Sequence, residues 1–109
     1  MNNTQRLFEY LTEAFIEDYM RRRLSLEKSG WRTFMQIIKS TKIPKTSIYQ
    51  TRSRRGPAIL ELEKRGIIEV RIFPGERGRG GKIMKARISY EKDIIKRHID
   101  RQIMKIKEK

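Results

Sequence analysis

Two short basic segments hold most of the chemistry that this sequence can offer. Residues 42–55 and 71–87 each have a net charge of +5, which together is ten of the fourteen excess positive charges of the chain. Clustered lysine and arginine bind a polyanion well, because each phosphate that they neutralise releases condensed counterions. A surface that served only to keep a protein in solution would mix both signs of charge. The two segments therefore predict a face that binds a polyanion.

The first segment combines basic side chains with short polar ones around the start of a predicted helix. Such groups contact phosphates or base edges, and a helix N-terminus adds free N–H groups. The candidate contact residues are Lys42, Lys45, Thr46, Ser47, Tyr49, Gln50, Arg52, Ser53, Arg54 and Arg55. Other interpretations stay open: Thr46 and Ser47 could only cap a short helix, Tyr49 could belong to the core, and the arginines could pair with glutamates elsewhere.

The second segment contains the glycine-rich run 75–81 between two strand-like runs. Glycines separate Arg77, Arg79 and Lys82 there. Glycine lets the backbone approach a narrow groove of negative potential, where arginine is favoured. A glycine-rich loop can instead cradle a nucleotide phosphate, but that site needs a strand, a loop and then a helix. Because this loop joins strand to strand, we expect Arg77, Arg79 and Lys82 to contact the polyanion.

The sequence predicts no reaction centre. His98 is the only histidine and cysteine is absent, so we expect no metal site and no disulfide. Glu9, Glu13, Glu17 and Asp18 line one region of a predicted helix, where a solvated face is a far commoner role than acid–base catalysis. We therefore expect a protein that is not an enzyme and that needs no cofactor.

Length and composition fit one small domain. The 109 residues are 37% hydrophobic and 37% charged, so a modest core can form within a single domain over residues 1–109. No apolar run approaches the roughly 18–20 residues of a membrane span, and the first residues do not resemble a signal peptide. We expect a cytoplasmic protein without a membrane partner.

Hydrophobic periodicity gives the order of the elements that must position the basic segments. Spacings of three and four between apolar residues predict helices at residues 4–24, 31–41, about 44–51, about 57–65 and 91–107. Alternation of apolar and charged residues predicts a β-hairpin within residues 67–90, with the glycine-rich run at its tip. Residues 51–56 are expected to form an exposed basic turn.

This order of elements, with the run Leu60-Glu61-Leu62-Glu63-Lys64-Arg65-Gly66-Ile67-Ile68-Glu69-Val70, resembles the winged helix-turn-helix family, notably archaeal winged-helix transcriptional regulators. The resemblance covers about residues 31–90. It implies an α+β fold, mainly α, with a two-stranded β-hairpin wing at 67–90, an extra N-terminal helix at 4–24 and a C-terminal helix at 91–107. It also implies double-stranded DNA binding by a sequence-specific transcriptional regulator, and with it a nucleoid-associated location. Two alternatives remain: a non-specific chromatin or architectural protein, and an RNA-binding or protein-interaction winged-helix module.

One departure from the family pattern concerns the element that contacts the bases. Ile48 is fourteen positions before Leu62, more than the usual spacing in a recognition helix. We interpret residues 51–56 as an insertion or as a split of that helix into two pieces. Residues 45–50 and 52–59 are therefore both candidates for the base-contacting element.

The last predicted helix has more apolar surface than a small domain needs. Ile95, Ile99, Ile103 and Ile106 form a stripe of about four turns. One interpretation is that this helix and residues 4–24 form the interface of a homodimer with two-fold symmetry. The other is that both terminal helices pack on their own domain.

Overall fold

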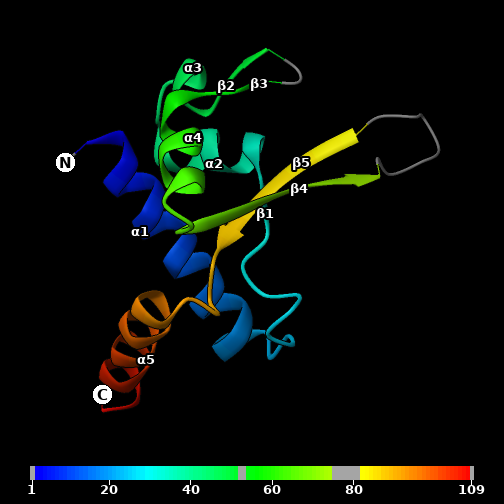
Figure 1. The fold of residues 1–109 in the computed structure, drawn as a ribbon. Helices are drawn as coiled ribbons and strands as arrows, with labels where there is room; N and C mark the ends of the chain where they lie inside the picture. Colours follow the sequence, from blue (N-terminus) through cyan, green and yellow to red (C-terminus); the bar gives the residue numbers. More distant parts are fainter. Residues whose placement is uncertain (1, 52–53, 75–81, 109) are drawn as a thin grey trace.

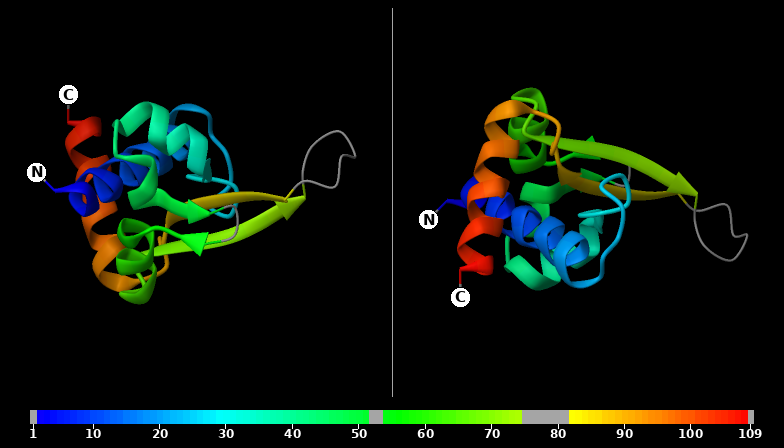
Figure 2. Two further views of the ribbon diagram at one scale, coloured as in Figure 1. Left: turned by 90° about the horizontal axis from the view of Figure 1, so that it is seen from above. Right: turned by 90° about the horizontal axis from the view of Figure 1, so that it is seen from below.

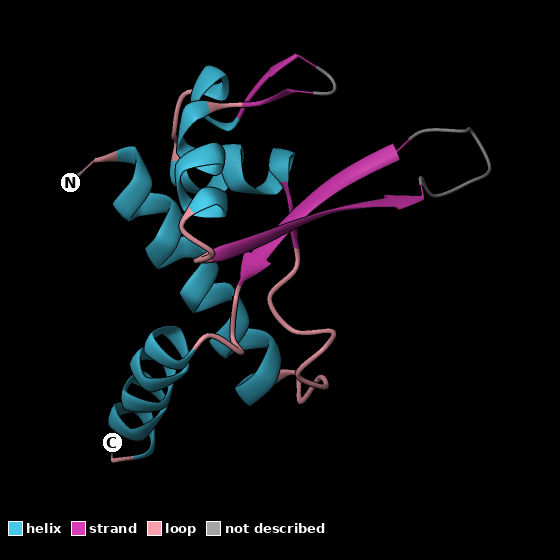
Figure 3. Cartoon of the chain, viewed as in Figure 1, coloured by secondary structure: helices cyan, strands magenta, loops and turns pink. Residues whose placement is uncertain are grey.

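The computed structural model describes residues 2–51, 54–74 and 82–108 (Figure 1). In chain order the elements are α1 (Asn3–Ile16), the π-helical turn η1 (Glu17–Arg21), β1 (Arg32–Thr33), α2 (Phe34–Thr41), α3 (Lys45–Ile48), β2 (Tyr49–Thr51), β3 (Arg54–Arg55), α4 (Pro57–Lys64), β4 (Ile68–Pro74), β5 (Lys82–Ile88) and α5 (Asp93–Lys107). The chain is thus an α+β protein, mainly helical, with a three-stranded antiparallel sheet (Figure 3). This architecture is compatible with a winged helix.

The N-terminal helix is shorter than the expected range 4–24. Asn2 caps it: the Asn2 side chain accepts a hydrogen bond of 2.8 Å from the backbone N–H of Gln5, and the Gln5 side chain accepts one from Asn2 N–H in return. The α-helical hydrogen bonds stop at Ile16, and the chain continues as a π-helical turn to Arg21. A single helix to residue 24 was therefore a wrong expectation.

The second helix begins three residues later than the expected range 31–41. Arg32 and Thr33 pair instead with Ala86 and Lys85 of β5, which makes them a short strand. Thr33 then caps α2, because its side chain accepts a hydrogen bond of 3.0 Å from the backbone N–H of Gln36. The cap explains why α2 starts at Phe34.

The wing has one strand more than predicted. The strand order of the sheet is β1-β5-β4, so β1 adds a third strand to the expected hairpin. Val70 pairs with Ala86, and the next pair along, Arg71 with Lys85, lies on the opposite face of the sheet. The sheet therefore has one apolar face toward the core and one basic face away from it.

The segment between α3 and α4 is a second β-hairpin rather than a helix end and a turn. The predicted helix 44–51 stops at Ile48, and Tyr49 and Thr51 pair with Arg55 and Arg54. Gly56 closes this hairpin, because its N–H donates a 2.7 Å hydrogen bond to the Ile48 carbonyl. The hairpin β2–β3 therefore separates α3 from α4.

Two clusters of buried side chains form the core. The larger joins α1, α2, α3, α4 and the sheet, and Leu7, Leu11, Ile37 and Ile59 are among its members. The smaller joins α5 to the rest: Phe15, Ile88, Ile95 and Ile99. α5 lies at the end of the molecule away from the wing (Figure 2). Among the described residues, no helix is long and apolar enough to cross a membrane.

Candidate nucleic-acid interface

The two hairpins project from the same side of the molecule. In Figure 1 the strand pair β2–β3 and the longer pair β4–β5 both extend away from α1 and α5, and β2–β3 lies above the wing. These hairpins belong to the two segments that hold most of the excess positive charge. The basic segments therefore reach the same side of the molecule, although the fifteen residues 56–70 separate them in the chain.

The turn between α2 and α3 exposes three of the predicted contact residues. Lys42 ends α2 with a backbone φ of 62°, a left-handed conformation that most residues avoid. Lys45 and Thr46 begin α3 and are also exposed, and the Lys45 Nζ lies 5.2 Å from the centre of the Tyr49 ring. Lys42, Lys45 and Thr46 are thus accessible to an anion.

Ser47 and Tyr49 make contacts inside the protein. The Ser47 Oγ accepts a hydrogen bond of 3.3 Å from the side-chain amide of Asn3. The Tyr49 ring stacks on Phe34 with centroids 6.1 Å apart, and its hydroxyl lies 3.3 Å from the Met35 sulfur. Both side chains therefore help to hold α3 in place. The interpretation that Ser47 caps this helix was wrong, because no side chain caps the N-terminus of α3.

Arg55 is already paired with a carboxylate. Its Nε lies 2.9 Å from Glu63 Oε1 of α4, without the alignment of a hydrogen bond, and both side chains are about 30% exposed (29% and 32%). One interpretation was that the arginines of this segment pair with glutamates elsewhere, and it is confirmed for Arg55. Its charge is largely compensated, so Arg55 is a weaker candidate than its neighbours.

Seven predicted contact residues lie outside the described residues, either completely or in their side chains. They are Gln50, Arg52, Ser53, Arg54, Arg77, Arg79 and Lys82. Their assignment to the interface remains a prediction from the sequence.

The basic face of the wing adds residues that the sequence analysis did not single out. Arg71 and Lys85 are cross-strand partners, and each has its charge near an aromatic ring, but Arg71 also forms an ion pair of 3.2 Å with Glu69. The Arg71 guanidinium lies 5.3 Å from the Trp31 ring, and the Lys85 Nζ lies 4.7 Å from the Phe73 ring. A groove of about 870 Å³ runs beside these four side chains. Trp31 falls within the expected helix 31–41, but it precedes β1 and packs on Phe73 of the wing.

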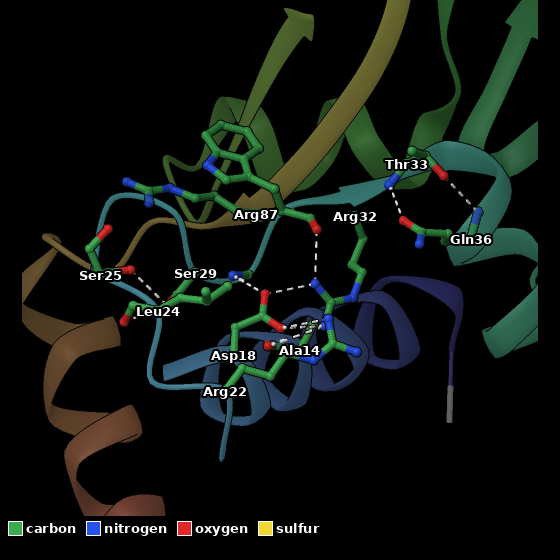
Figure 4. Close-up of polar contacts among 12 residues, drawn as sticks. Ala14, Asp18, Arg22, Leu24, Ser25, Ser29, Arg32, Thr33, Gln36 and Arg87 are labelled. Carbon is green, nitrogen blue, oxygen red and sulfur yellow. Dashed lines mark hydrogen bonds and ion pairs between the residues drawn. The ribbon is translucent and has the colours of Figure 1, made fainter. Parts of the chain in front are cut away.

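A buried ion pair holds the loop under this face (Figure 4). Asp18 of η1 accepts hydrogen bonds from Arg32, at 2.8 and 3.0 Å, and from the backbone N–H of Gly30, at 2.8 Å. Burial alone would raise the pKa of Asp18, but the hydrogen bonds from Arg32 and Gly30 outweigh it, so the pKa lies below its ordinary value. The pair fixes the path of the chain from α1 into β1.

Arg87 fixes the same loop from the side of the wing. Its guanidinium donates hydrogen bonds of 3.0 Å to the carbonyls of Leu26 and Glu27 and of 3.2 Å to the Glu69 carboxylate. Only 7% of Arg87 is exposed. This arginine is therefore a structural clamp and is not available to a polyanion.

His98 of α5 is turned toward α1. The imidazole is half-buried and lies 5.3 Å from the Phe8 ring. In the part of the chain that the structure describes, no group of three or more histidine, aspartate or glutamate side chains could hold a metal ion.

No protein-family model, no curated protein and no solved structure matches this chain. A functional assignment therefore depends on the residues and the geometry of this chain.

Proposed function

We propose that the protein binds double-stranded DNA with the side of the molecule from which its two basic hairpins project. The observation that supports this most is the common direction of β2–β3 and β4–β5 (Figure 1). One duplex can then contact both segments at once, which adds their charges in a single footprint. Lys42, Lys45 and Thr46 would contact phosphates beside them.

The order of elements suggests how such a winged helix-turn-helix would differ from its usual form. α2 and α3 would correspond to the helix-turn-helix, and β4–β5 to the wing. The recognition helix would be divided, because β2–β3 separates α3 from α4. The major groove admits a two-stranded β-ribbon as well as a helix. We therefore propose that β2–β3 enters the major groove and that the tip of the wing contacts the backbone or the minor groove.

We further propose that the protein is a sequence-specific transcriptional regulator that acts as a dimer. Two copies related by two-fold symmetry would place their β2–β3 hairpins on half-sites about one helical turn, or roughly 34 Å, apart. A non-specific architectural protein would use the same charges but would bind random duplex nearly as well as a selected site. An RNA-binding module would prefer an RNA competitor.

Selection of bound sequences from a random duplex pool tests this proposal. We expect a shared motif, bound roughly a thousandfold more tightly than random duplex. The variant Arg52→Ala/Arg54→Ala should blur the motif, whereas Arg77→Ala/Arg79→Ala should weaken binding to all sequences. Lys96→Ala/Lys107→Ala, which removes the same charge from α5, is the matched control and should retain the motif. Binding without a motif would contradict the regulator, and a stronger competition by RNA would contradict duplex DNA as the ligand.

A further inference from the structure

α5 presents an unusually apolar surface to the solvent. α5 buries Ile95 and Ile99, but Ile94, Met104 and Ile106 are 71%, 58% and 49% exposed. Single exposed apolar residues are normal, whereas three large ones on one helix of a small protein indicate a contact surface.

A valley between α1 and α5 lies next to this surface. One part, of about 370 Å³, is lined by Ile16, Met20 and Ile106, and the other, of about 230 Å³, is lined by Thr12 and His98. Glu13, Ile16 and Gln102 line both parts, so they form one continuous depression. Its floor offers apolar groups to a partner.

The wall of the valley that α1 and the first residue of η1 provide is acidic, although Arg21 at the end of η1 also lines it. Glu9, Glu13 and Glu17 follow one another at intervals of four residues and are exposed. Residues at this spacing share one helix face, so the three carboxylates form a ridge of about 12 Å. We name these three residues the acidic ridge.

α5 has a matching basic ridge, which we define as Arg97, Arg101 and Lys105. These residues are also exposed and also follow at intervals of four. Among the ion pairs of residues 2–51, 54–74 and 82–108, none involves a member of either ridge. Two ridges of equal length, equal spacing and opposite charge therefore lie on neighbouring helices without satisfying each other.

We propose that a second copy of this chain occupies the valley, in a two-fold dimer where the basic ridge of each copy packs against the acidic ridge of the other. A two-fold interface uses the same patch twice, so a patch with one acidic and one basic ridge complements itself. Exposed apolar residues of α5, among them Ile94 and Met104, would be buried between the ridges. Another protein would need to match both charges, whereas a second copy does so by symmetry.

The distribution of charge also favours this side for self-association. The whole chain has a charge of +14, so two copies repel each other at most surfaces, but residues 1–24 have no net charge. Because α5 lies away from the wing, a dimer through this side leaves both hairpins of each copy accessible (Figure 2). The inference specifies the dimer of the proposed function, and it can fail while DNA binding by a single copy holds.

A charge-swap experiment tests the interface. Sedimentation equilibrium at about 50 µM should give twice the 13.1 kDa mass of one chain for the wild type. Glu13→Lys/Glu17→Lys should be monomeric, and so should Arg101→Glu/Lys105→Glu, each with a dissociation constant raised roughly a hundredfold because every exchanged charge counts twice by symmetry. An equimolar mixture of the two variants should recover a dimer, which also shows that both variants are folded.

A matched control separates position from net charge. Glu91→Lys/Lys96→Glu exchanges two exposed charges outside both ridges and should remain dimeric. A monomeric wild type would overturn the inference, and so would two dimeric ridge variants or a mixture that stays monomeric. Anisotropy of a labelled duplex, measured with the same proteins, reports DNA binding independently: a monomeric wild type that still binds DNA rejects this interface alone.

Discussion

The two basic hairpins reach the same side of the molecule, but the protein holds them in different ways. The wing is anchored by side chains: Asp18 and Arg32 fix the loop beneath it, and Arg87 joins that loop to β5. In the hairpin β2–β3 the backbone takes part as well, because Gly56 packs directly on the end of α3 beside the side-chain contacts of Tyr49 and Arg55. The comparison teaches that the proposed binding face has two independent supports, which mutations can remove one at a time.

The largest expected effect comes from breaking the anchor of the wing. Asp18→Asn removes the charge that faces Arg32, and the two side chains are only 3% and 13% exposed. Loss of one partner of a buried ion pair should lower the free energy of unfolding by about 3–5 kcal/mol. Urea unfolding followed by circular dichroism measures this. Glu63→Gln, which breaks the more exposed pair with Arg55, is the control and should cost less than about 1 kcal/mol.

A somewhat smaller effect should follow from breaking the anchor of β2–β3. A Cβ atom at position 56 would lie 2.5 Å from the carbonyl oxygens of Thr46 and Ser47. Gly56→Ala should therefore cost about 3 kcal/mol, because the backbone of the hairpin must move away from α3. Gly66→Ala is the comparison: its backbone is left-handed, with φ of +70°, and its nearest new contact is the flexible end of Lys92, so about 1–2 kcal/mol is expected. Equal losses in the two variants would show that Gly56 is not a specific support.

The anchor of the wing should also respond to acid. Because the pKa of Asp18 in the folded protein lies below its ordinary value of 3.8, the charged carboxylate contributes stability that is complete above about pH 4. That contribution should be lost as the pH falls through the folded pKa. The wild type should therefore lose more stability than Asp18→Asn in the acid range below pH 4, as measured by urea unfolding at each pH. Parallel curves for the two proteins would contradict the role given to Asp18.

The smallest expected effect concerns Lys42, just before α3. Its substitution separates the role of its charge in DNA binding from the effect of its strained backbone on stability. Lys42 has a left-handed backbone, which glycine adopts without cost, so Lys42→Gly should raise the free energy of unfolding by up to about 1 kcal/mol. If Lys42 contacts a phosphate, the same change should weaken DNA binding and reduce the salt dependence by about one unit of slope. Lys39→Ala is the control, because it makes the same change of charge within α2. Lys39→Gly would not serve, because glycine would destabilise that helix. A more stable variant with unchanged DNA affinity would remove Lys42 from the interface.

Patterns of apolar residues predicted most of the elements. The spacing of Leu7, Leu11 and Phe15 predicted α1, and the alternation from Ile68 onward predicted the wing strands; both are confirmed. These elements bury one face, so their sequences record that face directly. The stop of α4 before Gly66 was predictable as well, because a left-handed residue favours glycine.

The elements that the sequence analysis missed depend on partners far away in the chain. β1 is two residues long and exists because Arg32 and Thr33 pair with β5. The π-helical turn contains Asp18, which bonds Arg32 fourteen residues later. No periodicity marks such contacts.

The sequence predicted the positive charge of the candidate site, but it did not predict which of the charged side chains are available to a ligand. The arginine cluster and the glycine-rich run were evident from composition alone. Arg55 pairs with Glu63, eight positions later in the chain, because of the hairpin between α3 and α4. No local sequence pattern predicted that hairpin. Arg71 and Lys85 gather on one face only because the register of β4 and β5 makes them partners.

The salt dependence of DNA binding tests the central claim most directly. For the wild type and for the variants Arg52→Ala/Arg54→Ala and Arg77→Ala/Arg79→Ala, the affinity for one duplex would be measured by anisotropy over a range of salt concentrations. If both hairpins contact the same duplex, the slope of log affinity against log salt should be about −4.5 to −7 per chain in the wild type, and each variant should make it less steep by about two units. A slope near zero, or a slope that only one of the two variants changes, would contradict a binding face that both hairpins share.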